Sequence, residues 1–92
     1  MLKKDKNHLA KIRTMPCLIC GSESEPHHLR ASWNAGMGQK PADIFTVPLC
    51  RKHHMELHSH GEEIFCSMYD INLWEELIHI WEELDMDNLL CY

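Results

Sequence analysis

Cysteine and histidine side chains gather in short segments of this 92-residue sequence, which holds five cysteines and eight histidines. Two residues separate Cys17 from Cys20, and two residues also separate Cys50 from His53. Together these pairs offer three thiolates and one imidazole, a ligand set that suits a tetrahedral Zn²⁺ with no open position. We therefore predict a structural zinc site on these four residues. Zinc binding there would supply folding energy that so small a core lacks.

The alternative for these cysteines is ordinary packing in the core. Cys66 and Cys91 have no partner at ligand spacing, and Cys66 beside Phe65 is predicted to be a packing residue. The number of cysteines is odd, and the basic N-terminus is not followed by the apolar stretch that a secretory signal has. Both features argue against a disulfide framework and favour metal binding in a reducing compartment.

A second candidate metal site consists of histidines that lie close in sequence to the predicted zinc ligands. His54 and His58 are four residues apart and so share one face of a helix, while His53 is rotated by about 100° from His54. His27 and His28 are neighbours, and neighbours on a strand point to opposite faces. One of them can therefore join His54 and His58 as a metal ligand while the other stands apart as a general base. Three imidazoles would leave coordination positions for water and substrate, whereas the alternative is a set of solvent-exposed histidines.

The elements that must position these side chains follow from local composition. Residues 1–13 are basic and predict either a short helix or a loose arm. Residues 22–26 are polar and predict a loop, and residues 27–33 and 44–49 predict two strands, with Pro48 at an edge or an exit from pairing. Hydrophobic spacing then predicts three helices, at residues 51–59, 62–69 and 73–84. The remaining histidines are predicted to be surface or packing residues: His8, His60 and His79.

The last predicted helix is amphipathic. Asn72 and Glu75 have the spacing of a capping box at its start, and Trp74 and Trp81 fall on its apolar face. We expect this face to pack over the rest of the domain. The alternative is an interface that forms a homodimer, because a chain of this size has little core of its own.

Charge is distributed unevenly along the chain, whose net charge is −5. Residues 1–52 hold all 9 Lys and Arg and 4 acidic residues, whereas residues 53–92 hold 10 acidic residues and no Lys or Arg. This asymmetry predicts a basic working face for a polyanion, since local potential rather than net charge steers binding. Four basic side chains near the histidines are candidates for phosphate contacts, and their alternative is solvated surface charge: Arg30, Lys40, Arg51 and Lys52. No apolar run approaches the roughly 18 residues of a membrane span, so we expect a soluble cytoplasmic protein with no membrane partner.

Five segments together resemble the HNH endonucleases, above all the phage- and prophage-borne members with a zinc knuckle, such as the phage recombination-enhancement nucleases. The segments are Cys17-x-x-Cys20, Pro26-His27-His28, Gly36-Met37-Gly38, residues 43–50 and Arg51-Lys52-His53-His54-Met55-Glu56-Leu57-His58. The resemblance covers about residues 17–58. It implies an α+β domain of the ββα-metal (HNH) fold, with two antiparallel strands, a loop and a helix around one catalytic ion, in a bacterial host cell. The C-terminal amphipathic helices would complete a single domain that divides into residues 1–13, 14–60 and 61–92.

The resemblance also implies the chemistry. His27, His54 and His58 would bind the catalytic ion and His28 would act as the general base in hydrolysis of DNA phosphodiester bonds, leaving 5′-phosphate and 3′-hydroxyl ends. The family usually has an asparagine before the second strand to orient the base, and here Asp43 is the nearest candidate and Asn34 a more distant one. Imidazole ligands suit Zn²⁺, Ni²⁺, Co²⁺ or Mn²⁺ better than Mg²⁺.

Two other classes of protein remain as alternatives. A non-catalytic, zinc-dependent module could hold nucleic acid without cutting it, although such a module has no use for a histidine beside a metal ligand. A purely structural zinc domain would bind one metal ion per chain, whereas the nuclease would bind two.

Overall fold

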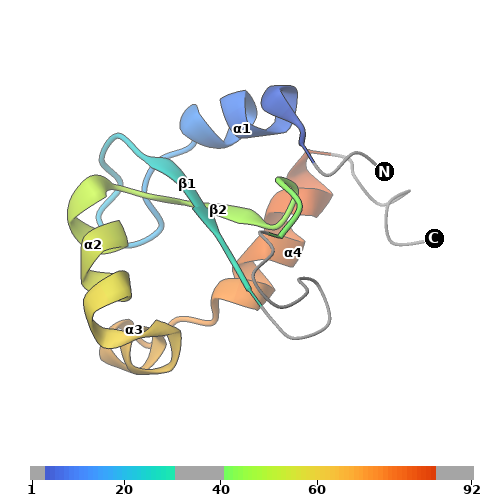
Figure 1. Ribbon diagram of the computed structural model, residues 1–92. Helices are drawn as coiled ribbons and strands as arrows, with labels where there is room; N and C mark the ends of the chain where they lie inside the picture. Colours follow the sequence, from blue (N-terminus) through green and yellow to red (C-terminus); the bar gives the residue numbers. More distant parts are fainter. Residues whose placement is uncertain (1–3, 31–40, 85–92) are drawn as a thin grey trace.

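The computed structural model describes residues 4–30 and 41–84, which form an α+β domain (Figure 1). The described helices and strands, in chain order, are α1 (Lys6–Arg13), β1 (Glu25–His28), β2 (Thr46–Leu49), α2 (Arg51–His60), α3 (Glu62–Tyr69) and α4 (Leu73–Glu83). Of the two alternatives for the N-terminal segment, the helix is confirmed. The three predicted C-terminal helices are also confirmed to within a residue or two.

Strands β1 and β2 form an antiparallel pair in which His27 lies opposite Val47 and Pro26 lies opposite Pro48. The pair is shorter than predicted and displaced toward the N-terminus in β1, which begins at Glu25 within the expected loop. Prolines are tolerated here because a sheet of two strands has an outer edge on each strand. The Pro48 carbonyl faces away from β1 and accepts a hydrogen bond from the Leu18 N–H at 3.1 Å. This bond attaches the 17–20 turn to the sheet.

The second strand starts two residues later than predicted because a turn precedes it. The Phe45 N–H donates to the Ala42 carbonyl at 3.0 Å, and the Thr46 hydroxyl donates to the Asp43 carbonyl at 2.8 Å. The same turn places Ile44, whose carbonyl accepts a hydrogen bond from the Trp81 indole N–H at 2.8 Å. Helix α4 is thereby tied to the start of β2.

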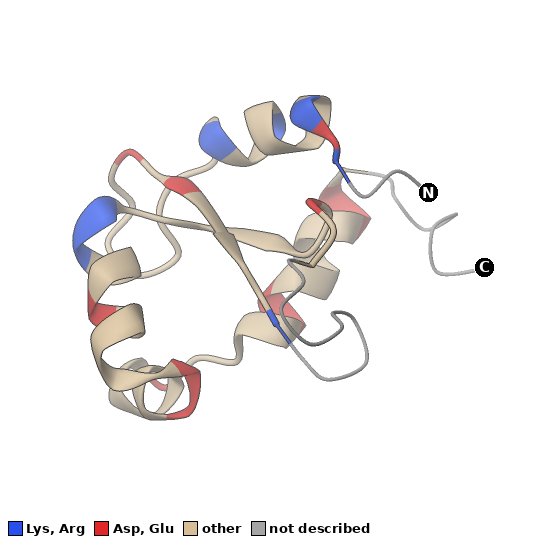
Figure 2. Cartoon of the chain, viewed as in Figure 1, with Lys and Arg blue, Asp and Glu red and all other residues tan. Residues whose placement is uncertain are grey.

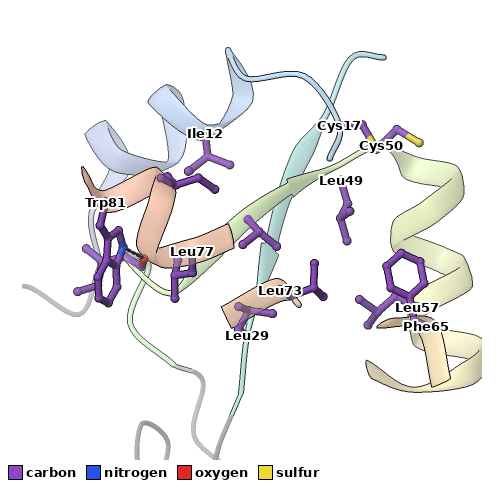
Figure 3. Packing of buried hydrophobic residues seen from close by; sticks show 13 residues of the cluster. Ile12, Cys17, Leu29, Leu49, Cys50, Leu57, Phe65, Leu73, Leu77 and Trp81 are labelled. Carbon is purple, nitrogen blue, oxygen red and sulfur yellow. Dashed lines mark hydrogen bonds between the residues drawn. The ribbon is translucent and has the colours of Figure 1, made fainter. Parts of the chain in front are cut away.

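The core lies between the strand pair and the surrounding helices (Figure 3). Ile12 of α1, Leu49 of β2, Phe65 of α3 and Leu77 of α4 are all almost fully buried. Burying one such side chain stabilises the fold by roughly 1.5–3 kcal/mol. The apolar face of α4 therefore packs back over the domain, as predicted, whereas the homodimer remains a prediction.

The Asn72 side of the predicted capping box in α4 is confirmed, because the Asn72 side chain accepts a hydrogen bond from the Glu75 N–H at 3.1 Å. Gly61 separates α2 from α3 with a φ of +88°, a backbone conformation that favours glycine. None of the described helices has the length and hydropathy that a membrane crossing requires. Lys and Arg lie on α1 and at the start of α2, while α3 and α4 carry acidic residues, as Figure 2 shows.

Candidate metal centres

The predicted zinc ligands Cys17, Cys20, Cys50 and His53 come together, with all four ligand atoms within 4.8 Å of one another. The Cys20 and Cys50 sulfur atoms are 3.7 Å apart, and the His53 Nδ1 lies 3.7 Å from the Cys17 sulfur and 3.1 Å from the Cys50 sulfur. A tetrahedral zinc ion with ordinary bond lengths places two sulfurs about 3.8 Å apart and a sulfur and a nitrogen about 3.6 Å apart. The four residues can therefore hold a structural zinc.

Local backbone geometry explains how these ligands converge. The 17–20 turn closes through a hydrogen bond from the Gly21 N–H to the Cys17 carbonyl at 2.9 Å, and Gly21 has a φ of +76°. Cys50 is the N-cap of α2, so His53 lies in the first turn of that helix. Hydrogen bonds from Ser22 lower the pKa of the Cys20 thiol to about 6. The thiolate, which is the form that binds zinc, is therefore favoured near neutral pH.

Three further histidines meet between β1 and α2. The ligand nitrogens of His27, His54 and His58 all lie within 4.8 Å of one another. His27 is buried, and its ring centroid is 4.8 Å from that of His54 and 5.5 Å from that of His58. Burial, together with the neighbouring imidazoles, lowers the pKa of His27 to about 3. This ring is therefore neutral at physiological pH, as a metal ligand has to be.

A carboxylate that the sequence analysis missed supports this group. The Glu25 Oε1 lies 2.8 Å from the Nδ1 of His54. When Nδ1 donates its proton to Glu25, the Nε2 of His54 is the atom left to bind a metal ion. Strand alternation contains a signal for this role, since Glu25 is two residues before His27 and shares its face of β1.

His28, the residue after His27 at the end of β1, pairs with Asp43. The His28 Nε2 is 2.9 Å from the Asp43 Oδ1, and both side chains are mostly buried. A proton on Nε2 donated to this carboxylate leaves Nδ1 with a free lone pair. Of the two candidates for orienting the base, Asp43 is the one beside His28, while Asn34 falls outside the described residues.

The histidines open onto two adjoining hollows that share His27, His28 and His58. The larger is about 410 Å³ in volume, and its other lining residues are Leu9, Arg13, Pro26 and His54. The smaller is about 320 Å³, and its other lining residues are Arg30, Leu57, Gly61 and Glu62. Each hollow therefore has one arginine beside the histidines.

The basic residues differ in how they lie relative to these hollows. Arg30 lines the smaller one and Arg13 lines the larger one. Arg51 and Lys52 are exposed in the first turn of α2, and Arg51 lines a separate hollow with Glu23, Ser24 and Glu25. Lys40 falls outside the described residues.

Glu62 and three other histidines belong to neither group of candidate ligands. Burial raises the pKa of Glu62, an effect partly offset by a hydrogen bond with Trp74. His60 and His79 are exposed, as predicted. His8 is a buried packing residue, and its Nε2 has no hydrogen-bond partner within the described part of the chain.

Residues 2–79 match the model of a family described as protein of unknown function (DUF968). The chain belongs to this family. A 49-residue stretch, 52% of this chain, is 51% identical to part of the uncharacterized protein YdfU of Escherichia coli strain K12, and it covers only 14% of that protein's length. No solved structure matches the chain.

Proposed function

We propose that this chain is a metal-dependent HNH endonuclease of the ββα-metal fold that hydrolyses DNA phosphodiester bonds. The proposal rests on the arrangement of four histidines and one carboxylate. Three histidines from β1 and α2 converge on a solvent-open hollow, and His28 beside them is held by a buried carboxylate. A site with three imidazole ligands and free coordination positions is typical of a catalytic metal, whereas four protein ligands close the neighbouring site.

In this proposal the Cys-rich group stabilises the fold, and the histidine group takes part in the reaction. The Cys17, Cys20, Cys50 and His53 group connects the 17–20 turn to the start of α2, so zinc there would fix α2 against the sheet. His54 and His58 lie on the same helix and face His27. A structural zinc would thereby hold the catalytic ligands in place.

The proposed reaction uses His28 as the general base. With Nε2 bonded to Asp43, the Nδ1 of His28 takes a proton from the attacking water, and Asp43 stabilises the resulting imidazolium. The new bond joins the water oxygen to phosphorus, the bond from phosphorus to the 3′ oxygen breaks, and the 3′ oxygen takes up a proton from solvent, leaving 5′-phosphate and 3′-hydroxyl ends. His27, His54 and His58 would hold a divalent ion (Zn²⁺, Ni²⁺, Co²⁺, Mn²⁺ or Mg²⁺), which supplies Lewis-acid stabilisation of charge on the phosphate and the leaving oxygen.

The arginines favour a polynucleotide as substrate. Arg13 and Arg30 line the two hollows that adjoin the histidines, so they can contact phosphates on different sides of the bond to be cut. Of the acidic residues on α3 and α4 (Figure 2), Glu62 lines the smaller hollow, and the others line neither of the two. Binding to DNA is expected to weaken steeply with salt, because each phosphate contact releases counterions.

Nicking of supercoiled plasmid by the purified chain tests the proposal. The unmodified protein should nick with added Mn²⁺, Ni²⁺, Zn²⁺ or Mg²⁺ and should not nick with chelator, while circular dichroism monitors folding. His28→Ala should abolish nicking, and His60→Ala should not, since His60 is exposed on α2 outside the histidine hollows. DNA retention in a gel shift without cutting under any metal would favour the binding module instead.

A further inference from the structure

The start of α1 contacts the carboxylate that pairs with His28. The main-chain N–H of Asp5 donates a hydrogen bond to the Asp43 Oδ2 at 2.8 Å, across 38 residues of sequence. The other carboxylate oxygen, Oδ1, lies 2.9 Å from the His28 Nε2. Asp43 therefore joins the backbone of Asp5, the N-cap residue of α1, to the proposed general base, one oxygen facing each.

We propose that the main-chain N–H of Asp5 is a positioning group for His28, acting through Asp43. The inference rests on the proposed function and adds to it the part that α1 plays. Donors on both oxygens of a carboxylate fix its plane more firmly than a donor on one oxygen does. A fixed Asp43 holds the Nε2–H tautomer of His28, so that Nδ1 keeps the lone pair that accepts the proton from water.

The Asp5 N–H is itself held firmly. The Asp5 side chain accepts a hydrogen bond from the His8 N–H at 3.0 Å, and the Asp5 carbonyl accepts one from the Leu9 N–H at 3.1 Å. His8 and Ile12 are the buried residues of α1 that anchor the helix on the domain. The positive end of the helix dipole also attracts a carboxylate placed there.

Two donors on one carboxylate also give a physical reason for aspartate at this position, where HNH enzymes usually have asparagine. An asparagine side chain has only one acceptor oxygen, and its amide group is a donor. Because the Asp5 N–H and the His28 Nε2–H lie at different oxygens of Asp43, an asparagine in the same position can accept from one of them but presents its NH₂ group to the other. With the α1 contact present, Asp43 is the residue that satisfies both groups.

An ester in place of the Asp5 amide tests the inference because it deletes the N–H without changing any side chain. Chemical synthesis of a 92-residue chain can introduce it, and refolding with zinc is checked by circular dichroism. A matched ester at Asn7 removes another N–H of the first turn that takes part in neither bond. We expect the Asp5 ester to lower kcat for nicking by about five- to thirtyfold with KM unchanged, and the Asn7 ester to leave both constants near those of the unmodified chain.

Ring ¹⁵N signals of His28 supply a readout that does not depend on activity. At about pH 8, where an ordinary imidazole is neutral, the unmodified chain and the Asn7 ester should show one tautomer with the proton on Nε2. The Asp5 ester should show a mixture of tautomers. An Asp5 ester with unchanged kcat and an unchanged tautomer would overturn the inference.

Amide exchange keeps the inference testable if the ester does not fold. In the unmodified chain the Asp5 N–H should be protected from exchange, and Asp43→Ala should remove the protection. Exchange of the Asp5 N–H as fast as that of an exposed amide would overturn the inference. A chain that cuts no DNA with any metal, yet shows the single His28 tautomer and the protected Asp5 amide, would refute the proposed function while supporting the contact.

Discussion

Glutamine in place of Glu25 should weaken metal binding at the histidine centre without affecting the zinc site. Glu25 contacts His54 through a 2.8 Å hydrogen bond to Nδ1, and its negative charge makes the Nε2 of that ring a stronger ligand. Removing such an outer carboxylate typically lowers metal affinity by about 10- to 100-fold. Because the Glu25 side chain is 44% exposed, water screens part of the effect, and we expect a loss near the lower limit, about tenfold.

Calorimetric titration with Co²⁺ measures this loss, using protein whose Cys-rich site is already loaded with zinc. Glu23→Gln is the matched control, since Glu23 is exposed, lies two residues away and carries the same charge. The hydrogen bond to His54 predicts that Glu25→Gln weakens Co²⁺ binding much more than Glu23→Gln does. Equal losses of Co²⁺ affinity in the two variants would mean that each glutamate acts only through its negative charge. The proposed role of the hydrogen bond from Glu25 to His54 would then be refuted.

Three further substitutions test other parts of the structure. Asp43→Asn should keep the fold but lower kcat for nicking by about 5- to 150-fold, because Asp5 and His28 bond to different oxygens of Asp43 and the amide keeps an acceptor at only one of these places. An unchanged kcat would refute this. Cys20→Ser should lower the zinc content and reduce unfolding free energy by more than about 2 kcal/mol, whereas Cys66→Ser, outside the ligand group, should leave the zinc content unchanged. His8→Leu should flatten the pH dependence of stability below about pH 6.5, as measured by urea denaturation, and a parallel profile would contradict this.

The sign of the His8 effect follows from its environment. Burial is the main cause that lowers the pKa of His8 from its ordinary value. The unfolded chain then binds more protons than the folded chain between the folded and unfolded pKa values, so stability rises with pH in that window. Leucine cannot bind the proton, which removes this contribution at a rate of up to about 1.4 kcal/mol per pH unit. Subtracting the His8→Leu profile of unfolding free energy against pH from the wild-type profile isolates the contribution of His8, because the other histidines titrate in both proteins.

Helices α2, α3 and α4 could be predicted because their signals are local. Apolar spacing defines the buried faces, Gly61 ends α2, and Asn72 caps α4. The four zinc ligands and the pair His54 and His58 were found for the same reason, since each pair is three or four residues apart. Strand β1 was misplaced because Pro26 indicates a loop, whereas a sheet of two strands accepts proline at its outer edge.

The missed parts of the site depend on contacts between distant segments. The partner of Glu25 is 29 residues away, and that of the Asp5 N–H is 38 residues away. The Asp5 group is also a backbone amide, which every residue except proline carries, so residue type gives no indication of its role. Arg13 reaches the hollow only because α1 packs against the strands.

The rate of plasmid nicking, measured on samples whose bound metal ions per chain are counted by native mass spectrometry, tests the central claim most directly. The proposed centre of His27, His54 and His58 predicts that chains with only the zinc of the Cys-rich site are folded and inactive, and that activity appears with the second ion. His58→Ala should keep the first ion and lose the second together with the activity. Full nicking by chains that hold a single ion would contradict the account.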